Sequence, residues 1–332
     1  MTAKERIAVL LEENRSRYIS GEEMAERLGV SRAAVWKAIG LLKENGYQID
    51  AVTGKGYCLS EDTDVLSVSG IKNRLQPSLQ NFEIDVYKEV TSTNTLLRQK
   101  AADGAAEGTT VIAQRQTGGK GRFGRSFFSP EDSGLYMSIL LRPNLTAAEA
   151  TLITAAAAVA VCEAIETTVG GNPQIKWVND VYLNEKKVCG ILSEGNYSME
   201  SGQLEYVILG IGINVYEPTG GFPKELAGIA GALSEKQQGG LKNRLAAGIT
   251  QNVMNHYARL SARGFLIEYR RRCFVTGQRI TIKKNGENIP ALALGVDDDC
   301  KLCVRYDDGA EEALFSGEVS TRLDPPDNNG LT

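Results

Sequence analysis

The chain has 332 residues, of which 42% are hydrophobic and 23% charged, and these values are typical of a water-soluble protein with about two or three domains. Its formal net charge of −4 excludes a protein that binds polyanions over its whole surface, so contact with nucleic acid would need a local basic patch. No apolar signal segment is found near residue 1, and the longest apolar run, near residues 151–161, is shorter than the roughly 20 residues of a membrane span. The six scattered cysteines favour a reducing cytoplasm over a disulfide framework, and the lone C-x-x-C at Cys300 and Cys303 is not expected to bind a metal.

Residues 1–62 are predicted to form three helices followed by a two-stranded hairpin. Capping boxes begin the first two helices, at Thr2 and at Ser20, and Ser31 caps the third. The stretches YQIDAV and YCLS, joined by the turn TGKG, have the pattern of a hairpin. This order predicts a winged helix-turn-helix domain, in which the third helix enters the major groove of DNA.

The exposed face of that third helix and the hairpin turn carry the candidate DNA contacts. These are Ser31, Arg32, Trp36, Lys37 and Lys55. The alternative is a three-helix domain that contacts another protein and whose charges are simply solvated.

Residues 66–272 are predicted to form a second domain of the α+β class. Helices and strands alternate at first, and a run of adjacent strands from QIKWVND to YVILGIGINV then indicates a mixed or antiparallel sheet. Thr146 and Glu149 are expected to cap a long alanine-rich helix. Residues 273–323 contain short strands separated by turns, which predicts a small barrel, and the tail at 324–332 is expected to be disordered.

The stretch GGKGRFGR at 118–125 combines four glycines with three positive charges. It matches the dinucleotide fingerprint G-x-G-x-x-G, but no helix follows it to receive a pyrophosphate, so the sequence argues against a Rossmann site. The Walker A lysine and the kinase H-R-D loop are also missing. A mobile, cationic loop that binds a phosphate during a reaction remains, and the alternative is a plain surface loop.

The only histidine, His256, lies in a helical stretch far from this loop in the sequence. Reactions that need a general base usually draw on histidine or on paired carboxylates. Attack of a carboxylate on the α-phosphorus of ATP needs neither, because the nucleophile is already ionised and pyrophosphate leaves as an anion. Lysine, arginine, glycine backbone and magnesium are sufficient for such a reaction.

Five blocks stand in order along the chain: TSTN at 91–94, QTGGKGRFGR at 116–125, KWVND at 176–180, KKVCGIL at 186–192 and GIGINV at 210–215. In this order and spacing they resemble the bifunctional biotin–protein ligase and biotin operon repressor family, in its group with an N-terminal winged helix. The resemblance covers nearly the whole chain. It implies a class II synthetase-like central domain and an SH3-like C-terminal β-barrel.

The resemblance also implies which residues form the site. Biotin would be bound by Ser92, Thr93, Asn94, Gln116, Gly119, Lys120, Gly121, Arg122, Lys187, Gly190 and Ile213. ATP would be bound by Lys120, Arg122, Lys176, Asn179, Asn214 and Phe222. The catalytic residues would be Lys187, Arg122, Lys176 and Asp180, and Asp180 would act through magnesium or by orienting Arg122. Simpler explanations exist for some of them: TSTN also fits a helix cap, Lys187 a solvated hairpin lysine, and Phe222 a core residue.

The function implied is that of a biotin–[acetyl-CoA carboxylase carrier protein] ligase that also represses genes of biotin synthesis and uptake. ATP, Mg²⁺ and biotin would be its cofactors and substrates, and the carrier domain, operator DNA and a second copy of the chain its partners. Three departures from the family pattern are Lys120 in place of arginine, Phe123 in place of a basic residue and Val178 in place of proline. Two alternatives stay open: a non-enzymatic repressor that senses a small molecule, and a lipoate-type ligase of the same architecture.

Overall fold

The computed structural model describes residues 2–131, 133–146, 149–197, 203–284 and 287–321. The tail at 324–332, for which we expected disorder, lies outside them. The chain divides into two compact units, one made of Met1–Asn81 with Lys236–Gly248 and the other of Phe82–Glu235 with Ile249–Thr332.

The first unit contains the predicted winged helix-turn-helix. Its elements are α1 (Ala3–Glu13), α2 (Gly21–Leu28), α3 (Arg32–Glu44), β1 (Ile49–Val52), β2 (Gly56–Leu59), α4 (Val68–Lys72) and the 3₁₀ helix η1 (Pro77–Leu79). β1 and β2 pair antiparallel, as expected for the hairpin. The three core residues expected on α3, Val35, Ile39 and Leu42, are all buried in one cluster with α1 and α2.

The helix starts of this unit follow the predicted caps. At α1 the Thr2 hydroxyl accepts a hydrogen bond from the Glu5 backbone N–H (3.3 Å), and the Glu5 carboxylate accepts one from the Thr2 N–H (2.8 Å). The hydroxyls of Ser20 and Ser31 accept bonds from Glu23 N and Ala34 N. Each such bond satisfies a backbone donor that the helix leaves unpaired, so the sequence locally fixes where these helices begin.

The second unit is built on a seven-stranded mixed sheet with the order β3-β4-β5-β9-β8-β7-β6. Its strands are β3 (Ile84–Val90), β4 (Thr110–Gln116), β5 (Gly134–Leu141), β6 (Gln174–Lys176), β7 (Asp180–Leu183), β8 (Lys186–Tyr197) and β9 (Leu204–Asn214). Among the neighbouring strands that the structure describes in this sheet, β3 and β4 run parallel and the other pairs antiparallel. The expectation that QIKWVND forms one strand is wrong. β6 ends at Lys176, and the chain turns before β7 begins at Asp180, so that β6 and β7 pair as a hairpin.

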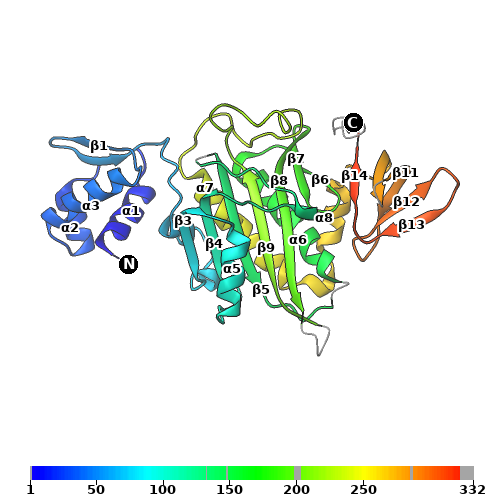
Figure 1. The fold of residues 1–332 in the computed structure, drawn as a ribbon. Coiled ribbons are helices and arrows are strands. Elements are labelled where there is room, and N and C mark those ends of the chain that lie inside the picture. The colour runs from blue at the N-terminus through cyan, green and yellow to red at the C-terminus, as the bar shows by residue number, and fades with distance from the viewer. Residues whose placement is uncertain (1, 132, 147–148, 198–202, 285–286, 322–332) are drawn as a thin grey trace. The chain divides into compact units, whose positions relative to one another are not determined.

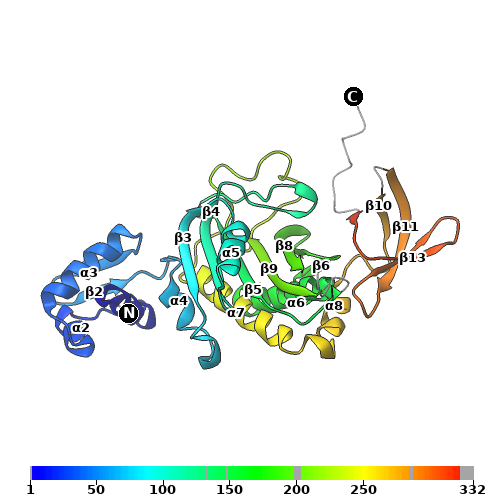
Figure 2. The same cartoon turned by 60° about the horizontal axis from the view of Figure 1, so that its bottom comes forward.

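Helices cover both faces of this sheet (Figures 1 and 2). α5 (Thr93–Ala102) packs on one face, where Leu97 and Ala101 meet Val111, Leu140 and Ile208. α6 (Ala150–Val169), the second half of α7 (Leu241–Tyr257) and α8 (Phe265–Arg272) lie on the other face (Figure 2).

The predicted pairing of Thr146 with Glu149 is present before the long helix α6. Thr146 donates from its N–H and its hydroxyl to the Glu149 carboxylate, over 3.0 and 2.8 Å, and the described helix runs from Ala150. Among the described residues α6 is the one helix long and apolar enough to cross a membrane, and most of it is buried inside the protein. This is the pattern of a core helix, as the sequence indicated.

The C-terminal strands form a five-stranded antiparallel sheet with the order β13-β12-β11-β10-β14. The strands are β10 (Arg279–Lys284), β11 (Glu287–Val296), β12 (Leu302–Tyr306), β13 (Glu311–Leu314) and β14 (Glu318–Ser320). Trp177 ties this sheet to the β6–β7 turn, because its indole N–H donates to the Cys300 carbonyl over 2.8 Å. Cys300 and Cys303 are free thiols.

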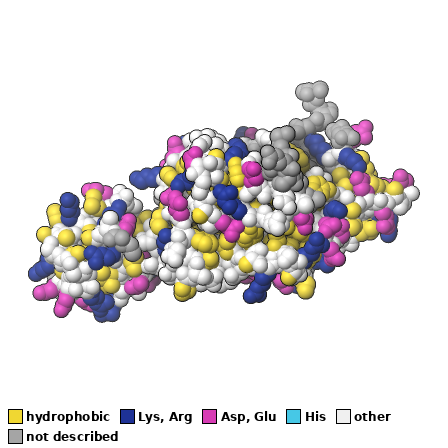
Figure 3. All heavy atoms as spheres, turned by 90° about the horizontal axis from the view of Figure 1, so that it is seen from below, with side chains coloured by type: hydrophobic (Ala, Val, Ile, Leu, Met, Phe, Trp, Pro, Cys, Tyr) yellow, Lys and Arg dark blue, Asp and Glu magenta, His cyan; other side chains and the backbone are white. Residues whose placement is uncertain are grey.

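On the face of the molecule seen in Figure 3, basic and acidic side chains are interspersed. This distribution agrees with the small net charge of −4. A nucleic-acid site on this protein must therefore be local.

Candidate functional site

A cavity of about 380 Å³ lies in the second unit, on the face of the sheet that α5 covers. Its walls come from the start of α5, the loop after β4, strands β6 to β9, the segment from Phe222 to Ala230, and Gly317 to Ser320 of the C-terminal sheet. Five segments that the sequence blocks singled out are thus brought to one place.

Glycines form the floor of the cavity. Gly190 of β8 and Gly212 of β9 are paired across the sheet. A β-carbon at Gly212 would stand 2.6 Å from the ring of Phe127, and one at Gly190 would stand 3.1 Å from it. Glycine is required at Gly212, because any larger residue would push that ring into the cavity.

The TSTN block and Gln116 form a polar wall. The backbone N–H of Thr93 and its hydroxyl both donate to the Gln116 side-chain oxygen, over 2.9 and 3.1 Å. Ser92 stands at the N-cap position of α5 and lines the cavity, but its side chain makes no capping bond. The TSTN block therefore begins the helix as predicted, without a cap from the Ser92 hydroxyl.

Asn94 lines the cavity next to this wall. Its side-chain oxygen accepts a hydrogen bond from the Ser138 hydroxyl (2.6 Å), and its nitrogen donates to Glu194 (2.7 Å). A β-carbon at Gly210 would collide with the Asn94 side chain, so this glycine makes room for it. Both ends of the Asn94 amide are engaged by the protein, which gives this residue a supporting position.

The glycine-rich loop folds as a tight turn beside the cavity. Gly121 N–H donates to the Arg125 carbonyl (2.7 Å), and Phe127 N–H donates to the Gly119 carbonyl (2.9 Å). The chain reverses at Phe123 and Gly124, which have φ values of 56° and 74°. The loop contains a 3₁₀ turn, η2 (Arg122–Gly124), where a dinucleotide-binding motif would need an α-helix. The structure therefore agrees with the prediction that this loop is not a Rossmann site.

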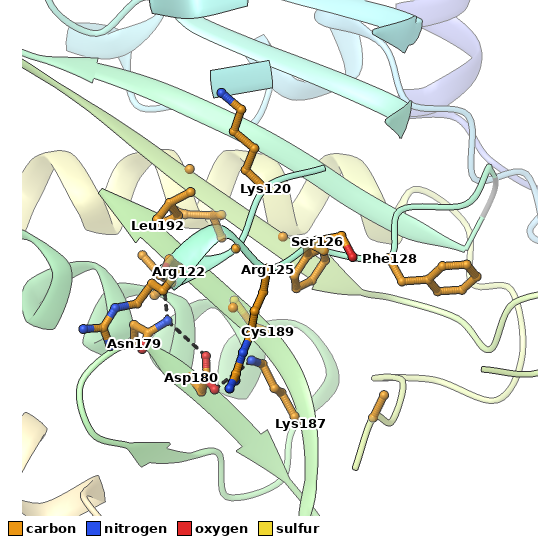
Figure 4. A pocket seen from close by; sticks show the side chains of 18 of the residues that line it. Lys120, Arg122, Arg125, Ser126, Phe128, Asn179, Asp180, Lys187, Cys189 and Leu192 are labelled. Carbon is orange, nitrogen blue, oxygen red and sulfur yellow. Dashed lines mark hydrogen bonds and ion pairs between the residues drawn. The ribbon is translucent and has the colours of Figure 1, made fainter. Parts of the chain in front are cut away.

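Charged side chains converge on the opposite wall (Figure 4). Arg122 donates to the side-chain oxygen of Asn179 over 2.9 Å, and the Asn179 nitrogen donates to Asp180 over 3.1 Å. The second oxygen of Asp180 lies 2.7 Å from the Lys187 ammonium group. Asn179 directly orients Arg122, and Asp180 forms an ion pair with Lys187.

Arg125 is a residue that the sequence did not single out as a ligand contact. In Figure 4 its side chain points toward Asp180 and Lys187. The loop sequence shows Arg125 as one of its three positive charges, but it does not show where the side chain points. Its place at the site depends on the reversal at Phe123, which the sequence pattern does not show.

The other residues expected to bind a nucleotide also reach the cavity, with one difference. Lys176 at the end of β6 is 9% exposed and lines it, as do Asn214 and Phe222. Asn214 donates to the Gly231 carbonyl over 3.1 Å. Lys120 lines the cavity too, but in Figure 4 its ammonium group points away from the cluster around Asp180.

Two residues expected at the biotin site do not line the cavity. Ile213 is fully buried on the other face of β9, because side chains alternate along a strand and its neighbours Gly212 and Asn214 face the cavity. Gly119 is buried within the loop, where a β-carbon would collide with the Phe127 carbonyl and the Ser129 hydroxyl. Gly119 therefore serves the packing of the loop.

The cavity offers charge and alignment but little acid–base chemistry. No histidine lines it among the described residues, and His256 instead pairs with Glu163 on the opposite side of the sheet. Burial raises the pKa of the Cys189 thiol well above its usual value, so this cavity residue stays neutral and is a poor nucleophile. Asp180 is the one carboxylate among the described lining residues.

The candidate DNA contacts lie in the first unit. Arg32, Trp36 and Lys37 are exposed on α3, where Trp36 has 73% of its surface open to solvent. Ser31 is the N-cap of that helix, and Lys55 in the hairpin turn lies 5.9 Å from the centre of the Tyr18 ring. An exposed tryptophan between two basic residues is a surface suited to a partner.

Three regions of the chain match known protein families. Residues 4–58 match an HTH domain, residues 86–214 the biotin/lipoate A/B protein ligase family, and residues 275–322 the biotin protein ligase C terminal domain. The bifunctional ligase/repressor BirA of Bacillus subtilis is 32% identical over 325 residues, which cover 96% of this chain and 98% of that protein. The BirA of Escherichia coli is 33% identical over 196 residues, 59% of each chain.

A solved structure is also similar. It is the biotin protein ligase from Aquifex aeolicus in complex with biotin and ATP, with a TM-score of 0.59 and 29% identity. The likeness covers 72% of this chain and 98% of that one.

Proposed function

Since the chain belongs to the family of bifunctional biotin ligase/repressors, we propose that its cavity joins biotin to ATP and passes the biotin to an acceptor protein. The enzyme is an ATP-dependent, AMP-forming biotin ligase. The observation that supports this site most strongly is that Arg122, Arg125 and Lys187 line one cavity opposite a polar wall, with no histidine among its described residues.

In the first half-reaction the polar wall would hold the ring system of biotin. The hydroxyls of Ser92 and Thr93 and the amide of Gln116 match the hydrogen-bonding groups of a ureido ring. The biotin carboxylate would then extend toward Lys187 and Arg122, which neutralise it together with the α-phosphate of ATP. One carboxylate oxygen attacks the α-phosphorus, pyrophosphate leaves, and biotinoyl-5′-AMP remains.

Lys176, Asn179 and Arg125 would hold the phosphates during this step. Phe222 and Asn214 also line the cavity and would contact the nucleoside. Asp180 would orient Lys187 through their 2.7 Å ion pair.

The residues present fit a magnesium ion that arrives with the nucleotide. Mg²⁺ is usually held by one or two carboxylates together with substrate phosphates, and Asp180 supplies one carboxylate beside the proposed phosphate site. When bound, the ion would add positive charge at the phosphates.

In the second half-reaction a neutral lysine amine of the acceptor attacks the acyl carbon of the adenylate, and AMP leaves. Until then the loop at 118–125 would keep water from the mixed anhydride. The acceptor we propose is the carrier domain of acetyl-CoA carboxylase.

An assay of pyrophosphate release tests the enzyme directly. Mixing the protein with biotin, ATP and Mg²⁺ should release pyrophosphate, and lipoate in place of biotin should release little. No release with either acid would favour a sensor without catalysis, and release with lipoate alone would favour a lipoate-type ligase. The polar side chains of the TSTN wall line the cavity and favour biotin, since a dithiolane ring has no group to pair with them.

The repressor role would use the first unit. We propose that Arg32, Trp36, Lys37 and Lys55 contact operator DNA upstream of biotin genes, as a homodimer in the cytoplasm. Residues 1–62, 66–272 and 273–323 would be the DNA-binding, catalytic and C-terminal domains. Binding to such DNA should be tighter with biotin and ATP than without, and Trp36→Ala should weaken it without changing pyrophosphate release.

A further inference from the structure

Ser129 lies directly behind the polar wall and has no role in the function described so far. It is 5% exposed and follows the glycine-rich loop, between that loop and β5. Its hydroxyl donates to the Phe127 carbonyl over 2.9 Å. A carbonyl can only accept, so the single proton of Ser129 is committed to it.

This commitment fixes the direction of the next hydrogen bond. With its proton used, the Ser129 oxygen can only accept, and it does so from the side-chain nitrogen of Gln116 over 3.0 Å. The Gln116 amide is thereby held with its nitrogen toward Ser129 and its oxygen toward Thr93. The backbone N–H of Thr93, which can only donate, selects the same orientation of that amide.

These hydrogen bonds form a relay from Ser129 through Gln116, and the relay ends at the Thr93 hydroxyl. Its proton lies between two acceptors inside the wall, the Gln116 oxygen 3.1 Å away and the Ser138 oxygen 2.7 Å away, because the single proton of Ser138 goes to the Asn94 oxygen. The lone pairs of the Thr93 oxygen are left, and Thr93 lines the cavity. Toward the cavity Thr93 therefore presents an acceptor, which suits an N–H group of the ligand.

Gly119 makes this arrangement possible. A β-carbon there would stand 2.6 Å from the Ser129 hydroxyl and would collide with the Phe127 carbonyl. A glycine is thus needed in the loop where the relay begins. The carbonyl in question is that of Phe127, whose ring covers the cavity floor.

We propose that Ser129 is a positioning residue for ligand recognition. Acting through Gln116, it sets Thr93 as the acceptor for a ureido N–H of biotin. This inference rests on the proposed function, since biotin is the ligand that supplies such an N–H.

The test measures steady-state pyrophosphate release by the full-length protein with Ser129→Ala. We expect the KM for biotin to rise roughly tenfold, while kcat and the KM for ATP stay within about twofold. Gly119→Ala should shift the KM for biotin in the same direction. Ser193→Ala is the matched control: its hydroxyl bonds Thr154 over 2.8 Å on the other face of the sheet, so it should leave the KM for biotin unchanged.

A double-mutant cycle separates positioning from simple packing. If Ser129 acts through Gln116, then Ser129→Ala should add nothing to the KM for biotin in a Gln116→Ala background. An additive rise, or a Ser129→Ala enzyme with the wild-type KM for biotin, would overturn the proposal. A wild-type protein that releases no pyrophosphate with biotin would refute the proposed function. That result is distinct from an additive rise in KM and from an unchanged KM, which concern Ser129 alone.

Discussion

Lys187 and Asp180 form the 2.7 Å ion pair at the centre of the charged wall, and each has a clear local reason for its place. β7 and β8 are a hairpin joined by Asn184 and Glu185, both with positive φ, so Asp180 and Lys187 lie near one another on neighbouring strands. The lysine is 30% exposed and the aspartate 19%. A partly solvated pair of this kind adds little to stability, so its value lies in placing an ammonium group at the cavity.

Replacement of this lysine should therefore separate activity from folding. Lys187→Ala should reduce adenylate formation by at least about a hundredfold, because it removes charge that stabilises the transition state. The free energy of unfolding should change by less than about 1 kcal/mol. Pyrophosphate release and chemical denaturation measure the two effects.

Lys88→Ala provides the control, since Lys88 is an exposed lysine on β3 outside the cavity. It should keep wild-type activity. Near-normal turnover by Lys187→Ala would contradict the assignment of Lys187 as catalytic.

At the scale of elements, the glycine-rich loop is joined to the β6–β7 turn by a side-chain hydrogen bond between Arg122 and Asn179. The Asn179 side chain is itself held by the Ile191 carbonyl over 2.9 Å, so it is a fixed anchor for the loop. The loop is then held over the cavity by a contact that can form and break.

Loss of this contact should release the adenylate early. Arg122→Gly should cause labelling of lysines on bystander proteins, and Asn179→Ala should cause less, because Arg122 itself remains to contact the ligand. Biotin transfer to serum albumin, compared with transfer to the carrier domain, measures the leak. Labelling confined to the carrier in both variants would show that the loop is not a lid.

The sheet beneath the loop depends on small residues at fixed positions. Gly210→Ala should destabilise the protein by about 1–3 kcal/mol, because the new methyl group would displace Asn94 from its bonds to Ser138 and Glu194. Its biotin affinity should fall as well. Urea denaturation and biotin titration measure these changes.

Gly264→Ala is the matched change, at a glycine with open space around it and an ordinary helical backbone. It should alter stability by less than about 0.5 kcal/mol. Equal stability of the two variants would mean that Asn94 can move without cost.

These elements show which features the sequence could reveal. The capping bonds of Thr2, Ser20 and Ser31 are local, so they were read correctly from residues three positions apart. Ile213 was assigned to the biotin site together with the rest of the GIGINV block. Side chains alternate along β9, so Ile213 points away from the cavity because its neighbour Asn214 faces it. The direction of Arg125 and the relay through Ser129 depend on a backbone reversal and on contacts across the loop, which no spacing in the sequence encodes.

At the scale of the whole molecule, three regions match the helix-turn-helix, ligase and C-terminal families, in this order along the chain. The second unit combines the central sheet with the C-terminal sheet, and Gly317, Val319 and Ser320 complete the cavity wall. Removal of the C-terminal sheet should therefore raise the KM for ATP as well as weaken acceptor labelling.

The central claim is that charge and alignment, without a general base, drive adenylate formation in this cavity. A single-turnover measurement of biotinoyl-5′-AMP formation between about pH 6 and pH 8.5 tests it most directly, since a histidine base would titrate near pH 6.5. We expect a rate constant that varies by less than about twofold across this range, because the biotin carboxylate is ionised throughout. A rate that rises tenfold per pH unit below a midpoint near neutrality would contradict it.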